Sequence, residues 1–292
     1  MKKNEILLTG REKVQPLVTV ITPLFNAQNF IGETIKSVLG QTYQNWEMII
    51  IDDCSTDNSR DIVKEYETKD SRIKLIELKK NFGGPARPRN IGLDISNGDY
   101  LAFLDADDVW LENKLQVQIN EMLINNLDFT STDSKFIDDN SIDTIINKYK
   151  IVIFFKKIKR KATLSDVIKG NFIRTSSAVI SKNFISKFDE NKDFIGVEDI
   201  YLWMKILNDK NIRYKYITEK LIKYRISSTS LSERGANEKQ ALKAKKELES
   251  IYGSELPEDA DIIIALGGDG LMLQTLHQYI DSNKPIYGMN LG

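Results

Sequence analysis

Four apolar runs of strand length alternate with four helix-like stretches over the first 126 residues of this 292-residue chain. The alternation is typical of repeated βαβ units, which form a mostly parallel sheet with helices on both faces. We therefore predict an α/β fold. The strand-like runs are Leu17–Thr22, Met48–Ile51, Ile73–Leu78 and Tyr100–Leu104, and the helix-like stretches lie near 28–40, 56–68, 87–96 and 111–126.

Three carboxylates follow the fourth run directly, in the segment Leu104–Asp108. Ligands of open α/β sheets bind outside the carboxyl ends of the strands. Because Mg²⁺ or Mn²⁺ is commonly held by one or two carboxylates together with substrate phosphates, the cluster predicts a metal–nucleotide complex. Alternatively, Asp107 or Asp108 caps an amphipathic helix starting near Leu111, which would explain one acid but not three. The apolar face predicted for that helix comprises Leu111, Leu115, Ile119, Met122 and Leu123.

Composition narrows the chemistry further. His277 is the only histidine and Cys54 the only cysteine, so acid–base chemistry and metal binding must rest mainly on carboxylates, and a multi-cysteine zinc site is excluded. With 41 basic and 42 acidic side chains, the net charge of −1 gives no indication of a nucleic-acid partner. No segment approaches the ~20 apolar residues of a membrane span, and the N-terminal apolar run is too short for a secretory signal. We expect a cytoplasmic protein.

Two other predicted strand ends carry suitable groups for a nucleotide. Pro23 and Phe25 follow the first run, and a nucleobase could stack on the aromatic ring there. Asp52 and Asp53 follow the second run, where a carboxylate can accept a hydrogen bond from a base or a ribose. The alternative is that these acids serve turns and helix caps, which is more credible for Asp57 than for the adjacent pair.

A glycine-rich segment follows the third run. Gly83 and Gly84 permit close approach of the backbone to a ligand, and Arg87 and Arg89 can contact a diphosphate bidentately. Together the strand ends and this segment converge on one ligand, a nucleoside diphosphate with its metal.

The pattern from 127 to 226 is less regular, and we interpret it as the acceptor-side half of the same domain. Within it, the basic run Lys156–Lys161 either contacts an anionic membrane surface or a phosphate-bearing lipid, or forms a solvated loop. The elements expected here are a strand at 127–132, the apolar run Ile151–Phe155, a strand at Ser177–Ser181, a helix near 198–208 and the region Tyr214–Ile226.

Several of these segments, in this order, resemble the successive motifs of family 2 glycosyltransferases. The resemblance covers about 16–232 and implies the GT-A fold, a Rossmann-like architecture, for a first domain at 1–232. It is specific for the family and uninformative about the substrate. The matching segments are Val20–Asn26, Ile51–Asp57, Arg89–Gly92, Leu104–Asp108 and Val197–Trp203.

The resemblance implies roles for individual residues. Either Asp52 or Asp53 would contact the base of the donor, Pro23 and Phe25 would belong to the donor-binding site, and Arg89 would approach the donor. Asp105 would lie near the ribose, and Asp107, together with Asp105, would hold a divalent metal on the diphosphate. Asp199 would be the catalytic base, although Glu198 and Asp199 also suit an acidic first helical turn without any catalytic role.

The activity implied is transfer of a sugar from a nucleotide-diphosphate sugar to a hydroxyl of a saccharide or lipid-linked acceptor. A base deprotonates the hydroxyl as it attacks opposite the departing diphosphate, and this single displacement inverts the anomeric configuration. We expect a role in cell-surface polysaccharide synthesis, at the inner face of the membrane if the 156–161 run contacts lipid. The chain departs from the usual motifs at Cys54 (usually glycine), Pro88 (usually alanine) and Ser227 (often histidine).

A second module is predicted at about 236–292, and it begins with the charged helical stretch Ala236–Tyr252. A strand-like run, Asp261–Leu266, leads into the turn Gly267-Gly268-Asp269-Gly270, and Gly288-Met289-Asn290 follows. The module resembles the start of an NAD kinase and would form a partial βαβ fragment. In that family the residue matching Asp269 serves NAD binding and catalysis. The given sequence stops at Gly292, before the remaining segments of such a kinase. Because a βαβ fragment alone cannot bury both faces of its sheet, we expect no kinase activity.

Three functions therefore compete. The first is a metal-dependent glycosyltransferase. The second is an NAD kinase-like or other nucleotide-binding protein. The third is an inactive chimera, that is, a fusion in which the kinase-like module at 236–292 impairs the transferase.

Overall fold

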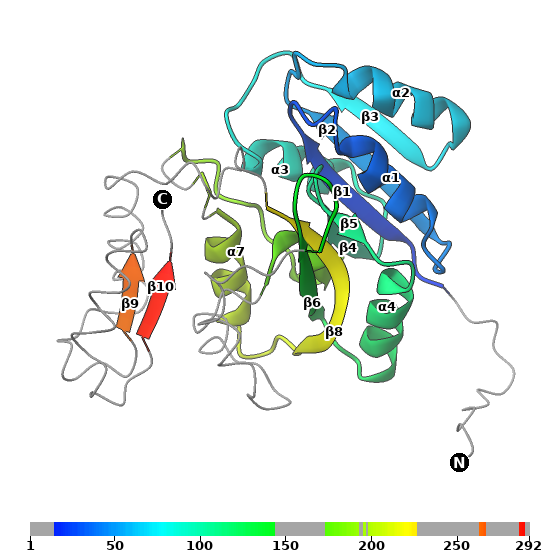
Figure 1. Ribbon diagram of the computed structural model, residues 1–292. Coiled ribbons are helices and arrows are strands. Elements are labelled where there is room, and N and C mark those ends of the chain that lie inside the picture. The colour runs from blue at the N-terminus through cyan, green and yellow to red at the C-terminus, as the bar shows by residue number, and fades with distance from the viewer. Residues whose placement is uncertain are drawn as a thin grey trace, which may run out of the picture.

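The computed structural model describes residues 15–143, 173–192, 195–196 and 198–226, and the backbone of 263–266 and 286–289. The main feature is an eight-stranded sheet of order β3-β2-β1-β4-β7-β6-β8-β5 (Figure 1). Separately, β9 (Ile263–Leu266) and β10 (Ile286–Met289) pair in parallel. The strands of the main sheet are β1 (Val18–Leu24), β2 (Trp46–Asp52), β3 (Ile73–Glu77), β4 (Tyr100–Phe103), β5 (Val109–Trp110), β6 (Phe129–Ile137), β7 (Val179–Ser181) and β8 (Tyr214–Arg225).

The first four strands are all parallel, which confirms the prediction of a mostly parallel α/β sheet for this half. They are connected by α1 (Ile31–Leu39), α2 (Ser59–Lys69) and α3 (Ala86–Ile95). From β1 the chain moves outward to β2 and β3, and then returns to place β4 on the other side of β1. The carboxyl ends of β1 and β4 therefore meet at a topological switch point, where such sheets bind their ligands.

The second half is mixed. β7 is antiparallel to both β4 and β6, β8 is parallel to β6, and β5 is antiparallel to β8. The strand expected at 177–181 begins two residues late, because Thr175–Ser177 form a 3₁₀ turn, η2. The helix expected from Leu111 begins at Lys114 as α4 (Lys114–Ile124), after β5.

The late start of α4 contradicts the capping alternative for the acidic cluster. The residue that precedes this helix is Asn113, and β5 separates it from Asp107 and Asp108. Those two carboxylates therefore do not cap α4, and another explanation is needed for their position.

Helices cover both faces of the sheet. α1, α2 and α4 pack on one face, and α3 and α7 (Glu198–Leu207) pack on the other (Figure 1). On α4, the predicted apolar face is confirmed at Leu115, Ile119 and Met122, which are buried, whereas Leu123 is 51% exposed. Six of the seven β1 residues and all seven of β2 are buried, as expected for strands covered on both faces.

Gly92 allows α3 to lie very close to the sheet. A Cβ atom at this position would come within 2.6 Å of Ile21 Cγ2 and 3.0 Å of Ile51 Cδ1, on β1 and β2. Only glycine fits without displacing these two side chains, and Arg89 is carried by the same helix. The spacing of α3 from β1 and β2 thus sets the depth at which Arg89 enters the sheet edge.

We predict that Gly92→Ala lowers the free energy of unfolding by about 1–3 kcal/mol through overpacking. Urea denaturation measures this change. Gly32→Ala in α1 is the matched control, because the nearest atom to its added methyl group is 3.8 Å away. There alanine's higher helix propensity should leave stability unchanged or slightly increased. Equal losses in the two variants would contradict the close-packing explanation.

Candidate active site

The turns after β1 and β2 are joined by hydrogen bonds. Asn26, in the left-handed region with φ of 48°, donates its backbone N–H to Ser55 Oγ at 3.0 Å and accepts the Thr56 N–H on Oδ1 at 2.7 Å. Phe25 lies on this joined surface with 51% of its area exposed, beside the half-buried Pro23. The two strand ends therefore present one continuous edge with an exposed aromatic ring.

Asp52 and Asp53 hold backbone segments. Asp52 accepts the N–H of Ser55 at 3.1 Å, which closes its own turn. Asp53 accepts the N–H of Phe82 at 2.9 Å and so fixes the glycine-rich segment after β3. Burial raises the pKa of Asp53, against the effect of these backbone donors.

Cys54 occupies a left-handed position, with φ of 64°, and its thiol donates to the Leu78 carbonyl at 3.0 Å. This backbone conformation costs a non-glycine residue energy, which gives a physical reason for the glycine usual in the family motif.

Arg89 is buried between two carboxylates from distant parts of the chain. Its guanidinium donates to Asp105 Oδ1 at 2.6 Å and to Glu198 Oε1 at 2.8 Å, and only 3% of the residue is exposed. Burial alone would lower the pKa of Arg89, but the two carboxylates outweigh it and raise the pKa. Arg89 therefore links the end of β4 to the start of α7. Arg87, in contrast, is exposed and pairs with Glu190 at 3.1 Å.

Besides Asp105, the acidic turn after β4 contains two carboxylates in different surroundings. Asp108 is buried and accepts the Arg225 N–H at 2.8 Å. The half-buried Asp107 carboxylate has neither a hydrogen bond nor an ion pair with any residue that the structure describes. Burial, reinforced by the charge of Asp105, raises the pKa of Asp107 to about 6. Among the described residues, the positive charge of Arg225 offsets the charge of Asp107 only in part, because the net effect is still a raised pKa.

Arg225, at the end of β8, holds this turn from behind. Its Nε donates to the Asp107 carbonyl at 2.8 Å, and its Nη2 donates to Glu33 of α1 at 2.8 Å. Its Nη1 donates to the carbonyl of Asp138 at 2.6 Å, where the chain leaves β6. The side chain is fully buried, and sequence reasoning assigned it no role. The available signal was an arginine at the end of the predicted region Tyr214–Ile226.

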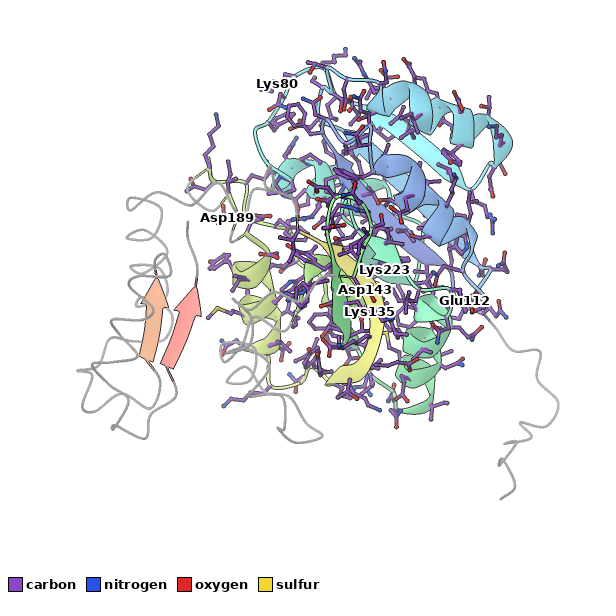
Figure 2. The ribbon with its side chains drawn as sticks, viewed as in Figure 1. Lys80, Glu112, Lys135, Asp143, Asp189 and Lys223 are labelled. Atoms are coloured by element: carbon purple, nitrogen blue, oxygen red, sulfur yellow. The ribbon has the colours of Figure 1, made fainter. Side chains whose placement is uncertain are left out.

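The loop after β6 folds back so that Asp143 bridges to Ile137. Figure 2 labels Asp143, Lys135 of β6 and Lys223 of β8. The two lysines are register partners in the β6–β8 pair. This loop and the β6–β8 pair border the acidic turn, because Arg225 contacts both.

Asp199 lies in the first turn of α7, next to the Arg89 ion pairs. Its Oδ2 accepts the Thr175 hydroxyl at 2.8 Å, and its Oδ1 accepts the Ile200 N–H at 2.7 Å. Burial raises the pKa of Asp199, and the charge of Arg89 acts in the opposite direction. A carboxylate held in this way, with its pKa moved toward neutrality, is suited to accept a proton.

A cavity opens beside the Arg89–Glu198 pair. One wall is the segment from Phe82 to Arg87, and the opposite wall comes from Asp189–Lys192, Ile195 and Glu198. Asp189 is labelled in Figure 2 on the segment that leads toward α7.

Several predicted features lie outside the described residues. They are the apolar run Ile151–Phe155, the basic run Lys156–Lys161, Ser227, and, in the kinase-like module, Gly267, Gly268, Asp269, Gly270 and Asn290. Among the helices that the structure describes, none combines the length and apolar character needed to cross a bilayer.

Comparison with known proteins agrees with this arrangement. The sequence model for "Glycosyl transferase family 2" matches residues 19–181. The chain is 38% identical over 216 residues to the Escherichia coli UDP-Glc:alpha-D-GlcNAc-diphosphoundecaprenol beta-1,3-glucosyltransferase WfgD, covering 74% of this chain and 79% of WfgD. It is 34% identical over 220 residues to the putative teichuronic acid biosynthesis glycosyltransferase TuaG of Bacillus subtilis, covering 75% and 82% respectively.

A similar fold occurs in the crystal structure of residues 1–349 of S. aureus TarS. The TM-score is 0.60 at 25% identity, and the match covers 79% of this chain and 65% of that structure. This likeness confirms the expected GT-A-like architecture, and with the family match and the two curated relatives it leaves the glycosyltransferase as the supported alternative. The chain belongs to glycosyl transferase family 2.

Proposed function

We propose that this glycosyltransferase moves a sugar from a UDP-sugar to a hydroxyl of a saccharide carried on a lipid diphosphate, in one inverting displacement with Asp199 as the base. The observation that carries the proposal is the position of Asp199 on α7, coupled through Arg89 to the acidic turn after β4. The donor and acceptor classes follow from the printed name of WfgD, with which the chain aligns over most of its length.

The donor base is proposed to bind at the joined turns after β1 and β2. Phe25 offers an exposed ring for stacking, and Pro23 lies beside it. Of the two adjacent acids we favour Asp53 as the base contact, because Asp52 closes its own turn and lies 3.6 Å from Arg60. The hydrogen bond from Phe82 to Asp53 would then bring the glycine-rich segment alongside the nucleotide.

The residues of the acidic turn fit a divalent cation such as Mn²⁺ or Mg²⁺. Asp107 presents a carboxylate that makes no ion pair with any described residue, and Asp105 shares one of its oxygens with Arg89. No group of three or more candidate ligand side chains occurs among the described residues, so substrate phosphates would have to complete the coordination. When bound, the cation would neutralise charge on the departing diphosphate.

The remaining chemistry falls to side chains of this chain. Asp199 would accept the proton of the acceptor hydroxyl as the oxygen attacks the anomeric carbon. Arg89 has both ends of its guanidinium occupied, so we assign it mainly to holding Asp105 and Glu198 rather than to a direct contact with the diphosphate. Glu198 fixes the start of α7 by accepting the Gly196 N–H at 2.7 Å.

The acceptor is proposed to be lipid-linked, and the enzyme would then act at a membrane surface. A basic run such as Lys156–Lys161 could contribute to that contact, which stays a prediction. The kinase-like interpretation of 236–292 has no support from the comparisons, and we assign that module no part in the activity.

We predict that the purified chain releases UDP from a UDP-sugar in the presence of Mn²⁺ and a lipid-diphosphate-linked GlcNAc acceptor. A panel of UDP-, GDP- and dTDP-sugars, read out as nucleoside diphosphate release, tests this prediction. No release from any donor would contradict the proposal and favour an inactive chimera. NADP formation from NAD and ATP would instead support the kinase-like alternative.

Asp199→Asn should lower kcat by 10²-fold or more with little change in the KM for the donor, because only proton acceptance is removed. Steady-state kinetics with the donor selected by the panel measures both constants. The matched control is Asp209→Asn, an exposed acid just beyond the other end of α7, which should keep the wild-type rate. A fully active Asp199→Asn would exclude this residue as the base.

Asp107→Asn should stabilise the metal-free protein at pH 7.5 by about 1–2 kcal/mol, after allowance for partial exposure of the group. The pKa of Asp107 is raised in the folded state from 3.8 to about 6. The folded state therefore binds more protons between these values, and this residue makes stability fall as pH rises from about 4 to about 6. Denaturation at pH 4.5 and 7.5 should show that the variant loses this part of the slope.

The same variant tests the metal assignment without an activity assay. Mn²⁺ with UDP at 100 times the dissociation constant should stabilise the wild-type protein by about 2.7 kcal/mol, and Asp107→Asn by much less. Equal stabilisation of both proteins would contradict a role for Asp107 in holding the cation. Asp61→Asn, an exposed acid of α2, serves as the control and should respond like the wild-type protein.

A further inference from the structure

The 3₁₀ turn η2 contacts both sides of the candidate active site with two consecutive hydroxyl groups. Thr175 Oγ1 donates to Asp199 Oδ2 at 2.8 Å, and Ser176 Oγ accepts the backbone N–H of Asp105 at 3.0 Å. Only 4% of Thr175 and none of Ser176 is exposed. One short turn therefore reaches the proposed base on α7 and the start of the acidic turn after β4.

The Thr175 contact orients the Asp199 carboxylate. The Ile200 N–H binds Oδ1, and the Thr175 hydroxyl binds Oδ2, so the side chain is held at both oxygens. Because the carboxylate accepts these bonds in its ionised form, they favour ionisation against the effect of burial. The hydroxyl thus has two effects, one on the direction of the carboxylate and one on its readiness to accept a proton.

Ser176 contacts the acidic turn at its first residue, Asp105, and at Trp110, which lies just beyond its last acid. The hydroxyl binds the N–H of Asp105, and the Ser176 carbonyl accepts the indole N–H of Trp110 at 2.8 Å. Trp110 belongs to β5, which follows Asp108 directly. Ser176 thereby fixes the chain on both sides of Asp107, without using the side chain of that residue.

The turn itself is held rigidly by buried groups. Ser177 donates both its N–H and its hydroxyl to the Arg174 carbonyl, at 2.8 and 2.7 Å. Gln118 of α4 donates to the Ser177 carbonyl at 3.0 Å from the opposite side of the turn. The positions of the two hydroxyls are therefore set before any substrate binds.

We propose that Thr175 and Ser176 are positioning residues for the transfer reaction, with Thr175 setting the base side and Ser176 the donor side of the site. The inference rests on the proposed function, because it takes Asp199 as the base and the turn at Asp105–Asp108 as the donor contact. The two adjacent hydroxyls would control two separable properties, namely the pH dependence of the reaction and the affinity for the donor.

Thr175→Val keeps the shape of the side chain and removes its hydroxyl. Loss of a hydrogen bond to the ionised base should move the acidic limb of the pH profile of kcat/KM upward by about one pH unit. It should also lower kcat at pH 6, while the KM for the donor and the affinity for UDP, measured by calorimetry, stay at wild-type values. Thr175→Ser retains the hydroxyl and should restore the wild-type pH profile.

Ser176→Ala should give the complementary result. With the Asp105 N–H released, the KM for the donor should rise and UDP should bind more weakly by roughly 5- to 10-fold. The acidic limb of the pH profile should stay where it is. Melting temperatures of all three variants, taken in the same buffers, separate these effects from a general loss of structure.

The inference is overturned if Thr175→Val leaves the pH profile unchanged, or if Thr175→Val and Ser176→Ala alter the same constants to the same degree. The role of Asp199 is tested separately by Asp199→Asn. If that variant is inactive while Thr175→Val is normal, only the positioning inference fails. If Asp199→Asn is active with an unchanged pH profile, the base assignment fails, and the positioning of a base by Thr175 fails with it.

Discussion

The buried ion-pair bridge through Arg89 is the interaction on which the arrangement of the site depends. A guanidinium that is 3% exposed would be strongly unfavourable by itself, and here it is compensated by Asp105 from the end of β4 and Glu198 from the start of α7. Removing both carboxylates would leave the buried guanidinium uncompensated, at a cost of about 3–5 kcal/mol. The bridge therefore joins the parallel half of the sheet to the helix that carries Asp199. The close packing of α3 at Gly92 fixes the position of the helix from which Arg89 extends.

The backbone at the acidic turn is fixed by groups other than its own acids. Arg225 binds the Asp107 carbonyl from behind, and Ser176 binds the Asp105 N–H. Neither contact uses the Asp107 carboxylate. The turn is thus preorganised, while the Asp107 carboxylate makes no ion pair with the residues that the structure describes, which is the arrangement expected of the cation ligand proposed above. The pKa of Asp107 is raised because its carboxylate is buried and lies near the charge of Asp105.

Local pattern was sufficient to predict the strand ends and the start of α7 near 198, because strand burial and helix periodicity are properties of short segments. The partners of the site residues were not predictable in this way. Arg89 and Glu198 are 109 positions apart, so only the packing of α3 and α7 on the same face brings them together. Thr175 belongs to a segment that was assigned to no element, and its hydroxyl acquires a role only because β7 runs antiparallel to β4. Sequence reasoning assigned Arg87 and Arg89 the same role, contact with a diphosphate. In the structure Arg87 is exposed and Arg89 is buried, so the two side chains have different surroundings.

The charges gathered around the site have a consequence for how it binds its donor. Five carboxylates, those of Asp105, Asp107, Asp108, Glu198 and Asp199, gather around the guanidiniums of Arg89 and Arg225. Burial raises the pKa of Asp107, Asp108, Glu198 and Asp199, so these acids hold their protons to a higher pH than freely exposed carboxyl groups do. A cation that binds at Asp107 must compete with such a proton and release it. Under the proposed assignments, donor binding is coupled to pH through Asp107 and proton acceptance through Asp199, so the two effects of pH on the reaction would have separate structural origins.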